Sequence, residues 1–116
     1  MDFNYLPEYY LLPDEINDFE DLLRDKKDDT TYILKPSKGR AGRGIKLVKT
    51  IQDIPKSAYE TETLVQKYIE NPLLMGNKKF DARLYVMIYG VDPIVAYLCE
   101  EGLARFCTHN YQKPNG

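Results

Sequence analysis

Charged residues that could bind an anionic ligand alternate along one segment of the chain, residues 79–85. If this segment is a strand, its period of two places on one face Lys79, Asp81, Arg83 and Tyr85. The opposite face is apolar, and charges are costly to bury unless they are paired or bound. A row of cation, anion and cation suits an anionic ligand with a divalent ion. The solvated face of an antiparallel sheet remains the alternative.

A second candidate ligand site is the glycine-rich segment 37–44, which carries Lys38, Arg40 and Arg43. Glycines let backbone amides approach a ligand closely, and the cations can make charge-assisted contacts to phosphate. The spacing is neither that of a Walker loop nor that of a dinucleotide fingerprint, and no helix is expected to follow it. The segment therefore predicts either a phosphate-contacting loop or a polar hairpin tip.

One helix and several strands must position these residues. We expect a helix from Asp14 to the Lys26-Lys27 pair, because an apolar stripe recurs at helical spacing in residues 16–23. Strands are predicted at 31–36, 45–49, 64–69, 79–89, 94–99 and 103–107. Short turns join the last three strands, so an antiparallel meander is expected there. Residues 1–13 are expected to be irregular or extended, with a turn or short helix around residues 53–55.

Size and charge narrow the class of protein. The chain has 116 residues, is 43% hydrophobic and carries a net charge of -2, which predicts at most one small domain. No general basic field is present, so neither nucleic acid nor a membrane is an expected partner. The start of the chain does not read as a signal peptide. Cys99 and Cys107 are expected to be reduced and packed, and His109 to lie on the surface.

Five short motifs follow one another at compatible spacing. They are Lys35-Pro36 before the glycine-rich loop, 66–69 with 71–74, 79–85, Asp92-Pro93, and 101–106. The chain resembles the tubulin–tyrosine ligase-like family over about residues 3–111, and it looks most like the tubulin polyglutamylase branch. The resemblance implies an α+β fold: a partial ATP-grasp fold, mostly antiparallel sheet with a short N-terminal helix.

The resemblance assigns nucleotide contacts to single residues. Lys35 matches the strand lysine that contacts ATP phosphates, and Ala41 and Gly42 lie in the loop that closes over them. The segment that lines the adenine pocket corresponds to Gln66, Lys67, Tyr68 and Ile69.

The resemblance also assigns roles to the charged residues at 79–85 and to Arg105. Lys79 and Asp81 correspond to residues at the phosphate and sugar end of the nucleotide. Arg83 corresponds to a catalytic arginine that steadies an acyl-phosphate intermediate. Arg105 corresponds to a substrate-binding arginine near the γ-phosphate and the incoming amino acid.

The family's chemistry defines the expected cofactors and partners. With ATP and Mg²⁺, an acceptor glutamate on a tubulin tail becomes an acyl phosphate, and the amine of free glutamate then attacks it. The expected partners are therefore tubulin tails or microtubules and free glutamate. The expected location is the cytoplasm and its cytoskeleton, with the cilium or basal body as a more specialised site.

The family's acidic and asparagine ligands for Mg²⁺ correspond to no residue of this chain, so the metal ligands are expected downstream of it. We therefore expect residues 1–116 to be the nucleotide-binding middle portion of a ligase domain, truncated at both ends and inactive alone. Two alternatives remain open. One is addition of glycine or tyrosine in place of glutamate, and the other is a non-catalytic remnant that binds nucleotide or microtubules.

Overall fold

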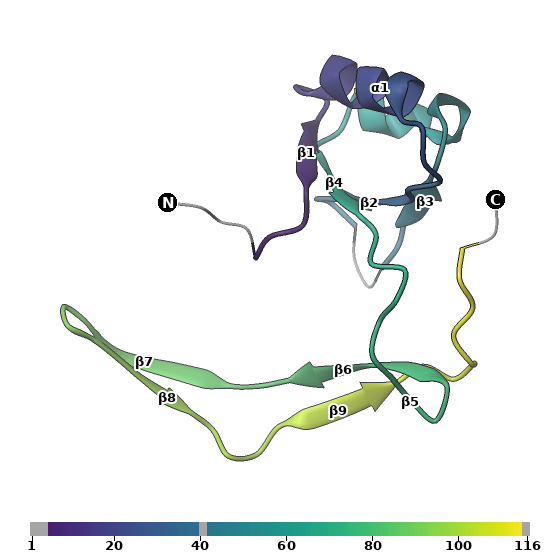
Figure 1. Ribbon diagram of the computed structural model, residues 1–116. Coiled ribbons are helices and arrows are strands. Elements are labelled where there is room, and N and C mark those ends of the chain that lie inside the picture. Colours follow the sequence, from purple (N-terminus) through teal and green to yellow (C-terminus); the bar gives the residue numbers. More distant parts are fainter. Residues whose placement is uncertain (1–4, 40–41, 115–116) are drawn as a thin grey trace. The chain divides into compact units, whose positions relative to one another are not determined.

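The computed structural model describes residues 5–39 and 42–114. The chain divides into two compact units, one formed by Met1–Glu70 with Pro114–Gly116 and the other by Asn71–Lys113 (Figure 1). The first unit contains β1 (Tyr9–Leu12), α1 (Ile16–Asp25), β2 (Tyr32–Pro36), β3 (Lys46–Val48), the 3-10 helices η1 (Ile51–Asp53) and η2 (Lys56–Tyr59), and β4 (Thr63–Lys67). The second contains β5 (Leu74–Met75), β6 (Lys78–Arg83), β7 (Val86–Val91), β8 (Ile94–Leu98) and β9 (Leu103–Phe106). The fold is mixed α/β, with antiparallel sheets and one α-helix in the described residues.

The predicted helix is confirmed, with slightly tighter bounds than expected. Helix α1 begins at Ile16 because the chain before it is held by two contacts between Leu11 and Glu15. The Glu15 amide donates to the Leu11 carbonyl at 2.9 Å, and the Leu11 amide donates to the Glu15 carboxylate at 2.6 Å. On the exposed side, Arg24 pairs with Glu20 and Asp21 one turn earlier. The apolar stripe is thereby left to face the sheet.

The first sheet has the strand order β1-β4-β2-β3, and every neighbouring pair is antiparallel. The predicted strands at 31–36, 45–49 and 64–69 are confirmed as β2, β3 and β4. Strand β1 was expected only as irregular or extended chain, and it pairs along its whole length with β4, Leu11 opposite Leu64. This pairing is nonlocal, so periodicity within residues 1–13 could not disclose it.

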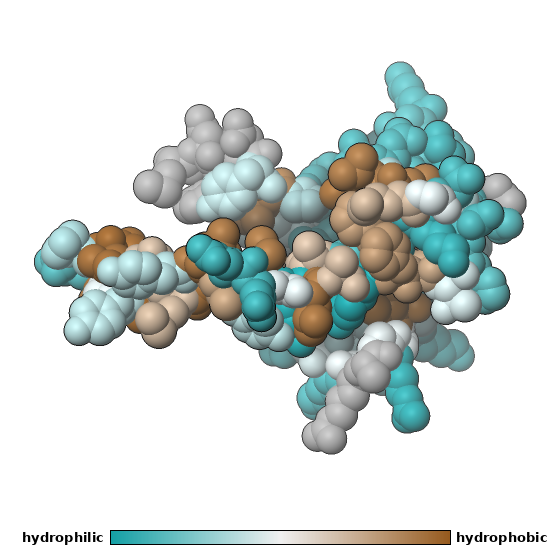
Figure 2. Space-filling view, turned by 90° about the horizontal axis from the view of Figure 1, so that it is seen from below, coloured by the Kyte–Doolittle hydropathy of each residue, from teal (hydrophilic) through white to brown (hydrophobic). Residues whose placement is uncertain are grey.

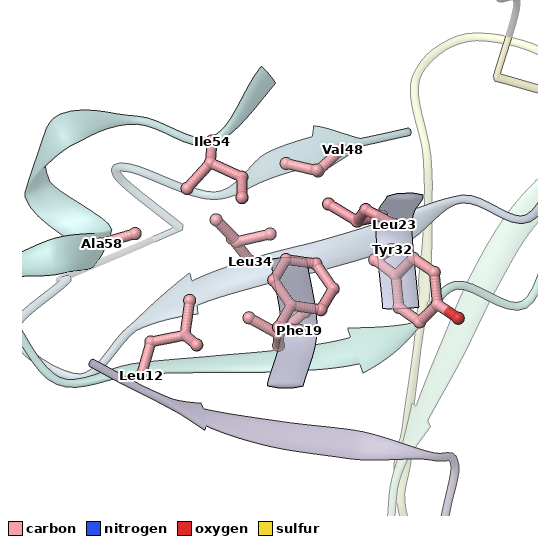
Figure 3. Packing of buried hydrophobic residues seen from close by; sticks show 9 residues of the cluster. Leu12, Phe19, Leu23, Tyr32, Leu34, Val48, Ile54 and Ala58 are labelled. Atoms are coloured by element: carbon pink, nitrogen blue, oxygen red, sulfur yellow. The ribbon is translucent and has the colours of Figure 1, made fainter. Parts of the chain in front are cut away.

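The core of the first unit lies between α1, the 3-10 helices and one face of this sheet (Figure 3). Its buried members are Leu12, Phe19, Leu23, Tyr32, Leu34, Val48, Ile54, Ala58 and Val65. The Phe19 ring packs edge-on against Tyr32, with 5.5 Å between ring centroids. Burial raises the pKa of Tyr32 to about 12, since the ionised phenol would lose its hydration.

The second unit departs from the predicted meander. The strand expected at 79–89 is interrupted at residues 84–85, so that β6 and β7 are separate. Strand β9 pairs with β6 instead of β8, Asp81 standing opposite Arg105, while β7 and β8 form their own hairpin. The prediction of a meander was wrong because the chain does not reverse direction between β8 and β9. β8 pairs with β7, and β9 then continues in the same direction and pairs with β6, the strand before β7.

Two glycines make this arrangement possible. Gly76 and Asn77 have φ of 56° and 61°, the left-handed pair that a two-residue turn between β5 and β6 requires. A Cβ on Gly102 would lie 2.7 Å from the Arg83 carbonyl oxygen. Glycine at position 102 therefore lets β9 enter its pairing with β6 without displacing the backbone of Arg83.

The second unit buries little of its apolar surface. Figure 2 shows hydrophobic and weakly polar side chains along β7 and β8, whose exposed fractions include 81% for Tyr89 and Val91. Cys99 and Cys107 are not in a disulfide, as expected, but both are exposed, so the prediction that they are packed was wrong. His109 is exposed, as predicted. No helix in the described part of the chain is long and apolar enough to cross a membrane.

Candidate functional site

Lys35 and Gln66 meet on the face of the first sheet that points away from α1. Strand alternation places them there, because their neighbours Leu34 and Val65 are buried on the core side. Since β2 and β4 are adjacent, the Lys35 ammonium reaches the Gln66 amide oxygen and donates a hydrogen bond of 2.8 Å. The structure thus brings together two residues that the sequence assigned to separate parts of one ligand site.

A hollow of about 560 Å³ lies beside Lys35, where β1 and β2 end and β4 begins. It is lined by Leu11, Leu12, Pro13, Asp14, Lys35, Ser37, Glu62, Thr63 and Leu64. Ser37 begins the glycine-rich segment that the sequence indicated, whereas Glu62 was not predicted; the Ser37 amide donates a 3.0 Å hydrogen bond to the Glu62 carbonyl. The antiparallel pairing of Pro36 with Thr63, which brings the residue before β4 beside the residue after β2, is the signal that could have found Glu62.

The segment 66–69 divides between two faces. Lys67 follows Gln66 and therefore points to the opposite side of β4. The amide of Lys67 donates to the Glu8 carbonyl and that of Tyr68 to the Thr31 carbonyl, each at 2.9 Å. A smaller hollow of about 350 Å³ is lined by Tyr5, Leu6, Pro7, Lys67, Tyr68 and Ile69. Two amides of the predicted adenine segment are thus engaged within the chain.

The glycine-rich segment connects β2 to β3 as a hairpin, as predicted. Gly42 and Gly44 have φ of 77° and 80°, a conformation that side chains disfavour. A Cβ on Gly39 would lie 2.6 Å from the Arg43 carbonyl oxygen. These glycines fold the loop closely on itself. Arg40 and Ala41, which the sequence placed in this loop, lie outside the described residues.

The charged row of the second unit lies on β6 and is completed from β9. Phe80 and Phe106 stack on one face of this pair, with 5.7 Å between ring centroids. Alternation therefore places Asp81 and Arg105 on the other face, directly opposite each other. Arg105 donates from Nε to the two Asp81 carboxylate oxygens at 3.2 and 3.0 Å, and from Nη2 to Oδ2 as well.

Electrostatics follow from this pairing. Hydrogen bonds from the Arg105 guanidinium lower the pKa of the Asp81 carboxyl, and the charge of Arg83 adds to the effect. Arg83 stands opposite Leu103 in the ladder, two residues from Asp81 and so on the same face. Lys79 shares this alternation, whereas Tyr85 lies beyond the end of β6 and is not part of its row.

The predicted site residues thus form two sets within the described ranges. Lys35 and Gln66 are joined in the first unit, and Asp81 and Arg105 are joined in the second, with Arg83 beside them. Within residues 5–39 and 42–114, no three of the His, Cys, Asp and Glu side chains gather as a metal site would require.

Comparison with known proteins identifies the class to which this fold and these residues belong. Residues 1–115 match the tubulin-tyrosine ligase family, and the chain belongs to that family.

Several relatives are tubulin polyglutamylases by name. The chain is 40% identical over 120 residues to human tubulin polyglutamylase TTLL11, which covers 97% of the chain and 17% of that relative. It is 43% identical over 111 residues to human tubulin polyglutamylase TTLL5, covering 96% of the chain and 8% of the relative. A probable beta-tubulin polyglutamylase of Tetrahymena thermophila is 39% identical over 114 residues, covering 97% and 9%. The chain therefore spans less than a fifth of the length of these relatives.

Proposed function

We propose that this chain supplies the nucleotide-binding part of an ATP-grasp ligase that adds glutamate to glutamate side chains of tubulin tails. The observation that carries the proposal is the Lys35–Gln66 pair beside a hollow of about 560 Å³. A lysine ammonium held at the rim of a hollow is suited to the phosphates of ATP. The names of the relatives support tubulin as the acceptor and glutamate as the added amino acid.

The proposed reaction has two steps. The acceptor carboxylate attacks the γ-phosphorus of ATP, ADP leaves, and an acyl phosphate forms. The amine of free glutamate then attacks the acyl carbon, phosphate leaves with the electrons of the broken C–O bond, and an isopeptide bond results. Both steps place negative charge on oxygens, so positioned cations would contribute most of the catalysis.

Each candidate residue has a part in this scheme. Lys35 and the loop containing Ala41 and Gly42 would hold the phosphates, and residues 66–69 would line the adenine pocket. Lys79 and Asp81 would lie at the phosphate and sugar end of ATP.

The two arginines would serve the transferred group. Arg83 would steady the acyl phosphate, and Arg105 would face the γ-phosphate and the incoming amino acid. Mg²⁺ would neutralise phosphate charge, and no residue of this chain is assigned to it. We propose that ligase activity requires the further length that the relatives possess, and that this chain alone binds nucleotide without catalysing.

A second candidate is addition of tyrosine instead of glutamate. The name of the family supports tyrosine, whereas the names of the relatives support glutamate. It uses the same ATP chemistry and the same residues. An assay that offers both amino acids to the tubulin tail distinguishes the two.

Titration of a non-hydrolysable ATP analogue with Mg²⁺ into the chain tests the nucleotide site. We expect binding, and we expect Lys35→Ala to weaken it by about tenfold or more, since a charge-assisted phosphate contact is lost. Lys56→Ala, which removes an exposed lysine from η2, is the matched control and should leave the affinity unchanged. A chain that is folded by circular dichroism and binds no analogue contradicts the proposal.

A further inference from the structure

A second hollow, of about 670 Å³, lies in the first unit where β2 begins and β3 runs into η1. It shares no lining residue with the hollow beside Lys35. Its lining residues are Lys26, Asp29, Thr31, Leu47, Lys49, Thr50, Asp53 and Pro114. Two lysines and two aspartates therefore line one space, and their charges decide what this hollow can bind.

Lys49 is a nearly buried cation whose counterion is exposed. Its side chain is 14% exposed, and its ammonium donates a hydrogen bond to the Asp29 carboxylate at 2.8 Å. The Asp29 side chain is 83% exposed and lies in the loop between α1 and β2. A buried cation needs an anion beside it, whereas an exposed carboxylate is well hydrated without a partner. Asp29 can therefore turn to solvent at little cost when another carboxylate reaches Lys49.

Lys26 supplies a second ammonium to the same hollow. Its Nζ atom donates to the Thr30 carbonyl at 2.6 Å, which holds the ammonium beside the loop that carries Asp29. A carbonyl is neutral, so this bond leaves the positive charge of Lys26 in place. Each ammonium has three N–H donors, and the hydrogen bonds seen in the described residues use one on Lys26 and one on Lys49. Donors of both lysines thus remain for a ligand.

The balance of charge indicates which anion fits. The backbone amides of Lys49 and Thr50 donate to the Asp53 carboxylate and lower its pKa, so Asp53 stays ionised at neutral pH. With Asp29 turned to solvent, two lysine ammonium groups face the single carboxylate of Asp53, which leaves an excess of one positive charge. One ligand carboxylate restores neutrality, whereas a phosphate dianion would bring a surplus of negative charge. The hollow therefore favours a carboxylate over a phosphate.

We propose that this hollow binds the side-chain carboxylate of an acidic peptide, which takes the place of Asp29 on Lys49. The hollow is larger than one carboxylate requires, so it has room for the peptide residues on either side. Leu47, which is 39% exposed, offers an apolar wall to the methylene groups of a glutamate side chain. The chain has a net charge of -2, so its overall field does not attract an acidic peptide and the attraction is local. Binding here requires neither ATP nor Mg²⁺.

Titration of end-blocked triglutamate into the full chain, followed by ¹⁵N NMR at low ionic strength, tests this site. We expect the amide signals of Lys49 and Thr50 to shift with peptide concentration. End-blocked triglutamine, which is uncharged, should leave them unchanged, and inorganic phosphate should bind more weakly than triglutamate. If triglutamate does not shift these signals, or if triglutamine shifts them equally, the proposal is refuted.

Substitution of the lysines locates the contact. We expect Lys49→Gln and Lys26→Gln each to weaken triglutamate binding by about threefold or more, because a charge-assisted contact is lost. Lys56→Gln removes the same charge from an exposed position on η2 and is the matched control, which should bind as the unsubstituted chain does. Equal losses in all three variants would show a general effect of charge and contradict the site.

Asp29→Asn provides the sharper test, because a damaged fold would not increase affinity. We expect roughly twofold to fivefold tighter binding of triglutamate, since the competing carboxylate is removed. Asp21→Asn, which removes an exposed aspartate that pairs with Arg24 on α1, is the matched control and should leave the affinity unchanged. Equal gains in both variants, or no gain in Asp29→Asn, would overturn the exchange at Lys49. Free glutamate that binds as tightly as triglutamate would refute a peptide as the ligand.

Discussion

The carboxylate of Asp53 shows how much a single residue can organise. Its Oδ2 atom accepts hydrogen bonds from the Lys49 amide at 3.0 Å, the Thr50 amide at 2.9 Å and the Thr50 hydroxyl at 3.0 Å. These bonds tie the end of β3 to η1. Because they favour the ionised form, and the two backbone amides contribute most, the pKa of Asp53 is lowered from its ordinary value.

We expect Asp53→Ala to lower the free energy of unfolding by about 1 kcal/mol at pH 7, the usual cost of a lost helix cap. A carboxyl whose pKa is lowered on folding stabilises the protein above its unfolded pKa, near 3.8, and this contribution is lost as the pH falls through the lower folded value. The difference between the two proteins should therefore shrink in acid. Urea unfolding at pH 7 and below pH 4 measures it, with Glu60→Ala as the control. A difference that stays constant with pH would contradict this role.

Arg83 is the residue whose substitution should separate catalysis from binding. In a protein that joins these residues to the further length that the relatives possess, we expect Arg83→Ala to lower the rate of glutamate ligation by about 100-fold or more, as removal of a transition-state contact does in other enzymes. Affinity for the ATP analogue should persist, because Lys35 and Gln66 lie on a different sheet. Ligation assays with a tubulin-tail peptide measure the first quantity and calorimetry the second. Unimpaired turnover would remove Arg83 from the mechanism.

At the scale of elements, the sheet of the first unit has two unlike faces. The core face is closed by α1 and the 3-10 helices, and Leu34 on that side is 1% exposed. The opposite face carries Lys35, Gln66 and partly exposed apolar residues such as Leu47, which is 39% exposed. Stability thus depends on one face, whereas the candidate ligand site lies on the other.

The two faces should respond differently to the same substitution. We expect Leu34→Ala to cost about 2–5 kcal/mol of unfolding free energy, because it leaves a cavity in the core. Leu47→Ala, on the adjacent strand, removes the same atoms from the open face and should cost less than about 1 kcal/mol. Chemical unfolding followed by circular dichroism measures both. Equal costs would show that the open face is as tightly packed as the core.

At the scale of the whole molecule, the two units differ in how well they are built to stand alone. The first has a closed core, whereas the second is made of short two- and three-stranded sheets with many exposed apolar side chains. Small isolated ribbons are marginally stable in water. This contrast agrees with a chain that spans less than a fifth of the length of its relatives.

Hydrogen exchange should report this contrast directly. We expect amides of β2 and β4, at the centre of the first sheet, to exchange at least about tenfold more slowly than those of β7 and β8. Exchange measured residue by residue by NMR tests the expectation, with β1 at the sheet edge as an intermediate reference. Equal protection in both units would show that β7 and β8 are covered in solution.

Local features of this protein could be predicted because they depend on near neighbours in the chain. The stripe in residues 16–23 specifies α1, and the strand-favouring residues at 31–36 and 64–69 indicate β2 and β4. The family could also be predicted from the sequence, because five motifs occur in order. The interruption at residues 84–85 was missed, since the apolar residues that follow continue to favour a strand.

Pairing between distant segments was decided by the tertiary structure alone. That β1 joins β4, and that β9 returns to β6 instead of β8, depends on chain reversal and register over dozens of residues, which no local period encodes. The same holds for the candidate site. The sequence by itself determined that Asp81 and Arg105 are charged and lie on strands. Only the antiparallel register placed them opposite each other, because hydrogen bonding between strands, and not spacing along the chain, sets which side chains meet.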